Sequence, residues 1–135
     1  MIELHVNAEN YNYVRYTIEK MNNAIIIFVL GEGNAKSRLR EATRWLNTIK
    51  GCYFPEEGSF REEINEAYSL LTKYHDIDEY NRRPKNSPES IYDATLNKIR
   101  NKTASKIIGI LYGVYASLSE EYHIFVYLLH NKKLL

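Results

Sequence analysis

The chain has 135 residues, a net charge of +1 and a single cysteine. This length suffices for one domain with its own hydrophobic core, and one cysteine excludes an internal disulfide framework. No apolar run approaches the roughly 20 residues that cross a bilayer, and the first residues lack a signal-peptide pattern, so we expect a single soluble, cytoplasmic helical domain over residues 1–135 without contact to a membrane.

Four stretches place apolar residues at alternating steps of three and four, which puts each set on one face of a helix. Such apolar stripes must be covered by other helices, which favours an all-α fold, an antiparallel four-helix bundle. The stripes are Tyr11, Val14, Ile18, Met21, Ile25 and Phe28; Ala35, Leu39, Ala42, Leu46 and Ile49; Phe60, Ile64, Ala67, Leu71 and Tyr74; and Ile91, Thr95, Ile99, Ala104, Ile108, Leu111, Tyr115 and Leu118.

In chain order, residues 1–7 form a short N-terminal arm, in which residues 2–6 alternate like a strand but are too few to stand alone. The first helix is expected over residues 8–30, ending at a glycine-rich turn. Asn34 caps the second helix, which ends before Gly51. Ser59 followed by Glu62 is a capping box that opens a third helix reaching about Tyr74.

The second half begins with a polar stretch, residues 75–86, that we expect to be a mobile loop. Ser87 and Pro88 then start a helix. A polar interruption near Asn101, with Thr103 as the cap of a new helix, would raise the number of helices to five or six. Residues 119–129 suit either a helix starting at Ser119, which we favour, or a strand pairing with the arm.

Charge is segregated along the chain although its sum is small. Residues 35–50 carry five basic and one acidic side chain, residues 51–80 two basic and eight acidic, and residues 81–106 seven basic and two acidic. Neighbouring solvated helices would explain this pattern, and so would an electrically two-sided molecule that docks on copies of itself or on a charged partner. The acidic interaction face would comprise Glu56, Glu57, Glu62, Glu63 and Glu66.

The basic segments also allow an alternative, a helical bundle that binds nucleic acid or another anionic partner, because phosphate contacts dominate such affinity. The near-neutral balance of the whole chain argues against a dedicated nucleic-acid binder. The candidate contacts are Lys36, Arg38, Arg40, Arg44, Arg82, Arg83, Lys85, Lys98, Arg100, Lys102 and Lys106.

No motif predicts catalysis, a metal or a cofactor. The glycine-rich turn before Lys36 lacks the spacing of a phosphate loop. The segment from His75 to Glu79 lacks a regular ligand spacing, and His123 and His130 stand too far apart to share one ion. Helical ribonucleases of the HEPN class place a histidine four to six residues after an arginine, and no arginine here has that spacing. Cys52 is expected to be a small, at least half-buried thiol.

Tyrosine is the preferred aromatic residue, with twelve copies against four phenylalanines and one tryptophan. Codon bias in an AT-rich or thermophilic source would explain this preference, and so would an interface rich in tyrosine. Together with the segregated charge, it leads us to expect a non-catalytic helical interaction module that oligomerises or serves as an accessory subunit of a larger, defence-related or other assembly.

The order of several short motifs resembles that of small bacterial helical proteins with no established activity. The resemblance covers residues 24–118 and implies a helical fold without implying a function. The motifs are Gly31-Glu32-Gly33, Arg38-Leu39-Arg40-Glu41-Ala42, Phe54-Pro55-Glu56-Glu57, Phe60-Arg61-Glu62-Glu63 and Leu71-Thr72-Lys73.

Overall fold

The structure is a computed structural model that describes residues 3–82, 84 and 90–131. Its elements are all helices, which confirms the all-α prediction, and the described residues contain no strand. The elements are α1 (Tyr11–Leu30), α2 (Ala35–Leu46), the 3-10 helix η1 (Gly51–Tyr53), α3 (Phe60–Leu71), α4 (Ile77–Asn81), α5 (Asp93–Lys98) and α6 (Asn101–His130).

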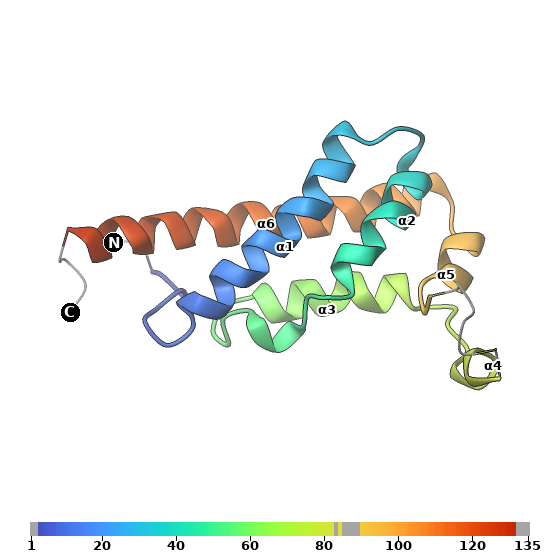
Figure 1. Cartoon of the computed structure of the whole chain (residues 1–135), viewed down its shortest axis with the longest axis horizontal. Coiled ribbons are helices and arrows are strands. Elements are labelled where there is room, and N and C mark those ends of the chain that lie inside the picture. The colour runs from blue at the N-terminus through green and yellow to red at the C-terminus, as the bar shows by residue number, and fades with distance from the viewer. Residues whose placement is uncertain (1–2, 83, 85–89, 132–135) are drawn as a thin grey trace.

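Four helices enclose the core, but they do not share one axis. Helices α3 and α6 run side by side in opposite directions, and the α1–α2 hairpin crosses them obliquely (Figure 1). Each helix of the hairpin packs against α6. The arrangement is therefore two crossed layers, and a simple antiparallel four-helix bundle is not confirmed.

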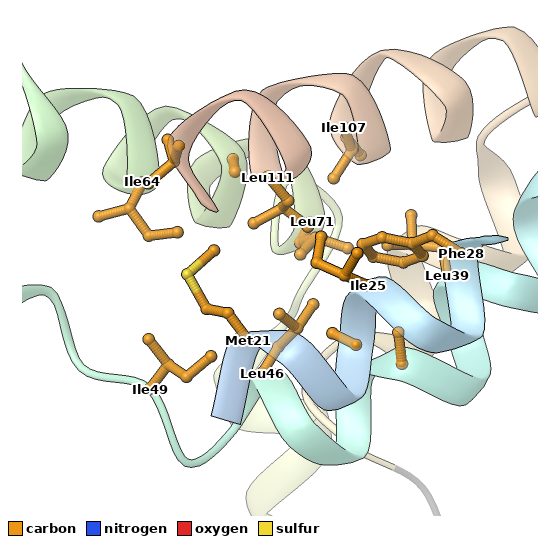
Figure 2. Close-up of a cluster of buried hydrophobic side chains, with 14 of the residues drawn as sticks. Met21, Ile25, Phe28, Leu39, Leu46, Ile49, Ile64, Leu71, Ile107 and Leu111 are labelled. Carbon is orange, nitrogen blue, oxygen red and sulfur yellow. The ribbon is translucent and has the colours of Figure 1, made fainter. Parts of the chain in front are cut away.

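The hydrophobic core forms where the predicted apolar stripes pack against one another. Met21 and Ile25 of α1 point toward Leu111 of α6 and the other buried side chains between the layers (Figure 2). In the fourth stripe Ile107 rather than Ile108 is fully buried, and Tyr74 at the end of the third stripe is exposed. The periodicity located the buried faces to within one residue.

The turn between α1 and α2 uses the predicted signals. Gly33 has φ +90°, the left-handed conformation that suits glycine. The Asn34 side chain accepts a hydrogen bond from the Ser37 backbone N–H at 3.0 Å, so it caps α2 as predicted. Helix α2 ends at Leu46, so Ile49, the last residue of the second predicted stripe, lies beyond the helix.

The predicted capping box before α3 does not form. Ser59 occupies the N-cap position, but its side chain makes no capping hydrogen bond, and α3 ends at Leu71 rather than near Tyr74. Ser59 has φ −100° and ψ 4°, outside the extended conformation usual for a capping residue. The two glutamates of the first turn still oppose the positive end of the helix dipole.

The expected loop over residues 75–86 contains a helix. Asp76 caps α4, because its Oδ1 accepts hydrogen bonds from the backbone N–H groups of Asp78 at 3.0 Å and Glu79 at 3.2 Å. The low apolar content of residues 75–86 favours a loop, although Asp76 is of a residue type that caps helices. Residues 83, 85 and 86, and the predicted helix start at Ser87 and Pro88, lie outside the described residues.

The break between α5 and α6 is confirmed, but it falls at Ile99 and Arg100, and Thr103 lies inside the first turn of α6 instead of capping it. Helix α6 then continues without interruption through Ser119, so residues 119–129 are helical as favoured, but no new helix starts there. Residues 3–7, the described part of the arm, do not form a strand with them. This part of the arm is held on α6 by side-chain contacts.

Candidate interaction surfaces

The start of α2 meets α5 and the start of α6 at one end of the molecule, and these elements belong to the two predicted basic segments (Figure 1). The Lys36 backbone N–H of α2 donates a hydrogen bond to Oδ1 of Asn101 at 3.1 Å. The guanidinium of Arg40 donates to Asp93 Oδ1 and Asn97 Oδ1 of α5, each at 2.9 Å. Segments that lie more than fifty residues apart in the sequence therefore form one surface, which we call the basic end.

The basic end surrounds a hollow of about 480 Å³. The N-termini of α2 and α6 lie in this region, and the positive ends of the two helix dipoles add partial positive charge to that of the side chains. The hollow is lined by Asn34, Lys36, Ser37, Arg40, Glu41 and Asn101.

The predicted basic residues do not all face solvent freely. Arg38 turns inward, and its guanidinium donates to the carbonyl oxygens of Gly33 at 3.1 Å and Phe28 at 3.0 Å, so it closes the end of α1. The Nζ of Lys98 lies 5.2 Å from the ring centre of Tyr74. Arg83 and Lys85 lie outside the described residues, whereas the remaining exposed side chains are Arg44, Arg82, Arg100, Lys102 and Lys106.

The predicted acidic residues lie toward the other end, where α3 begins beneath the first half of α1 (Figure 1). All five are exposed, Glu56 and Glu57 in the loop before α3 and the others on α3 itself: Glu62, Glu63 and Glu66. Glu9 lines the same hollow as Glu56 and Glu57, and Glu3 and Glu121 act together with Glu57 on His5. We call this region the acidic end. The acidic residues of α4 are not part of it, because α4 lies near α5 (Figure 1).

Glu121 holds the arm at the acidic end. Its Oε1 accepts hydrogen bonds from the backbone N–H groups of His5 at 2.5 Å and Val6 at 3.4 Å, and its Oε2 lies 3.1 Å from His5 Nδ1. The hydrogen bond to Glu121 is the main cause that raises the pKa of His5, and the negative charges of Glu121, Glu3 and Glu57 raise it further against partial desolvation.

Two adjoining hollows at the acidic end were not predicted from the sequence. One, of about 360 Å³, lies between the arm, α1 and the loop before α3, and its lining includes His5, Glu9, Glu56 and Glu57. The other, of about 330 Å³, is lined by Asn12, Tyr13, Tyr16 and Tyr53. Tyr13 and Tyr53 line both hollows. The available signals were Tyr13 and Tyr16 outside the apolar stripe and the high tyrosine content.

Tyr53 is the centre of a ring cluster. Its ring stacks on Tyr13, with 5.4 Å between ring centres and 11° between ring planes, and meets Tyr16 edge-on at 5.7 Å and 88°. Because η1 presents Tyr53 and α1 presents the other two rings, the cluster exists only in the folded chain.

The described residues at the two ends form no known catalytic arrangement. Cys52 borders the larger hollow and is exposed, contrary to the expectation of a half-buried thiol. Within the part of the chain that the structure describes, no group of three or more His, Cys, Asp or Glu side chains could hold a metal ion. No helix among the described residues is long and apolar enough to span a membrane.

The chain matches no family profile, no curated protein and no solved structure. The resemblance to small bacterial helical proteins accordingly stays a prediction.

Proposed function

We propose that the protein is a non-catalytic, cytoplasmic interaction module that associates head to tail, with the acidic end of one copy against the basic end of the next. The observation that supports this is the separation of charge along the long axis: the loop before α3, which carries Glu56 and Glu57, lies toward one end, and the start of α6, which carries Arg100 and Lys102, lies at the other (Figure 1). The same two surfaces suit a charged subunit of a larger assembly.

Charge complementarity would act on this association in two ways. Each exposed ion pair contributes only ~0 to 1 kcal/mol, so several pairs must form together. Opposite potentials also accelerate encounter and disfavour like ends. A head-to-tail contact uses different surfaces on the two partners, so it closes into a ring or extends into a chain. Association should therefore depend on concentration and weaken as salt is added.

Two charge-reversed variants test the pairing. Arg100→Glu with Lys102→Glu makes the basic end four charge units more negative, and Glu56→Lys with Glu57→Lys makes the acidic end four charge units more positive. We expect sedimentation velocity to show each variant alone as a monomer and an equimolar mixture as complexes. A matched control, Arg15→Glu with Lys50→Glu, changes exposed charges outside the basic end and should still associate. A wild-type protein that stays monomeric at high concentration and low salt would contradict the proposal.

A second candidate function is binding of nucleic acid at the basic end. The observation in its favour is the convergence of the basic segments of α2 and α6 through Lys36 and Asn101. Binding to single-stranded or duplex oligonucleotides should then fall steeply with salt and be lost in Lys36→Glu with Lys102→Glu. Arg38 is unsuitable for this test, because it closes the end of α1. Absence of binding to DNA and RNA at low salt would end this candidate.

A further inference from the structure

Three tyrosines at the acidic end form an open aromatic hollow that core packing does not require. Tyr13 is 58% exposed and Tyr16 is 39% exposed, so both rings keep much of their surface in water. Tyr53 contacts both of them and leaves a hollow of about 330 Å³ between the rings and Asn12. Ring faces that remain accessible in this way can stack on a ligand.

The cluster already attracts a cation. The Nζ of Lys20 lies 5.4 Å from the centre of the Tyr16 ring, within the range of a cation–π contact. The electron-rich faces of tyrosine rings favour positive charge, and planar guanidinium groups stack on them more readily than ammonium groups do.

The surrounding charge selects between ligands that could stack there. The hollow that shares Tyr13 and Tyr53 is lined by three carboxylates, those of Glu9, Glu56 and Glu57. Arg61 also borders it, but its Nε and Nη2 groups already donate to the carbonyl oxygens of Phe54 at 3.0 Å and Cys52 at 3.2 Å. Carboxylates would repel the phosphates of a nucleic acid and attract a cation. The site is therefore built for a positively charged planar group.

We propose that the tyrosine hollow receives the guanidinium group of an arginine presented by the basic end of a second copy, with the carboxylates beside it as hydrogen-bond acceptors. This assignment of the partner rests on the proposed head-to-tail association. Arg100, at the start of α6, is the arginine available there, because it is exposed and its side chain has no hydrogen-bonding or ion-pair partner among the described residues. Arg38 and Arg40 are already engaged within the chain.

The hollow can be tested separately from self-association with a small probe. Arginine capped at both termini is titrated into the charge-reversed monomer, Arg100→Glu with Lys102→Glu, while NMR follows the tyrosine ring signals. We expect the signals of Tyr13, Tyr16 and Tyr53 to shift. Capped citrulline, which has the same shape without the charge, should leave them in place. Equal shifts with citrulline, or shifts confined to other tyrosines, would overturn the assignment.

Ring removal locates the site. Tyr13→Leu and Tyr53→Leu should each weaken capped-arginine binding by about two- to five-fold, the loss of one exposed cation–π contact. Tyr112→Leu is the matched control, because Tyr112 is 51% exposed on α6 and outside the hollow. Tyr13 is exposed enough for its variant to keep the fold, which circular dichroism checks. An unchanged affinity in Tyr13→Leu and Tyr53→Leu would overturn the proposed site.

The two proposals can fail independently. If capped arginine binds the hollow while the wild-type protein remains monomeric, the cation site stands and head-to-tail association fails. If the protein associates but Tyr13→Leu and Tyr53→Leu leave both association and capped-arginine binding unchanged, association stands and the role of the hollow is wrong.

Discussion

The two ends of the molecule each use a charged side chain to join segments that are distant in the sequence, but they do so in different surroundings. Glu121 ties the arm to α6 where the His5 and Glu121 side chains are only 23% and 16% exposed. Arg40 ties α2 to α5 where Arg40 is 44% exposed and Asp93 20%. Glu121 also accepts from two backbone N–H groups, whereas Arg40 contacts side chains alone.

This difference predicts unequal stability contributions from contacts that look alike. A shielded carboxylate that satisfies backbone donors is expensive to remove, because those donors lose their only acceptor. An exposed ion pair is screened by water and salt. Three measurements test this comparison, in order of decreasing expected effect.

Glu121→Ala should lower the free energy of unfolding by about 2 kcal/mol, because the N–H groups of His5 and Val6 lose their acceptor in a partly buried place. Urea denaturation followed by circular dichroism measures the change. Glu120→Ala is the control, since Glu120 is the exposed neighbour on the same helix, and it should change stability by no more than about 0.5 kcal/mol. Equal losses in the two variants would refute the special role of Glu121.

Arg40→Ala should lower the free energy of unfolding by less than about 1 kcal/mol, because its partners Asp93 and Asn97 can be hydrated when the guanidinium is gone. Most of that loss should disappear when denaturation is repeated at high salt. A loss as large as that of Glu121→Ala would break the contrast between the two ends.

Stability should also fall slightly as the pH rises above about 6.5. The pKa of His5 is raised above its ordinary value of 6.5 in the folded chain, so protonated His5 stabilises the fold below about pH 6.5, and this contribution is lost as the pH passes the raised value. His5→Asn should remove this part of the slope in urea denaturation series. His123→Asn, at an exposed histidine of α6, should keep it. A slope that persists in His5→Asn would assign it to another group.

The predictions from sequence succeeded where the signal was local and repeated. The stripe through Val14, Met21 and Phe28 identified the buried face of α1, and Asn34 marked the start of α2. They failed where a neighbour decided the outcome. Ile49 is one case: the second stripe includes it, but α2 ends at Leu46, and the hydroxyl group of Tyr68 on α3 lies 2.9 Å from the carbonyl oxygens of Leu46 and Ile49 and can donate its hydrogen to either.

In the candidate site, too, some features were predictable from the sequence and others were not. The sequence identified the exposed charges and their segregation, because charge is a property of each residue. It did not predict that Arg38 donates hydrogen bonds to backbone carbonyl groups, that Arg40 pairs with α5, or that the ring of Tyr53 contacts two tyrosine rings of α1.

The sequence by itself determined that the chain is helical, which helix faces are buried and which segments carry each sign of charge. These properties follow from residue spacing within one helix, where positions three and four apart share a face. Only the tertiary structure decided that the hairpin crosses α3 and α6, that the basic segments converge, and that the tyrosines enclose a hollow beside carboxylates. Such arrangements depend on how different stripes pack against one another, and spacing along one segment carries no information on that packing.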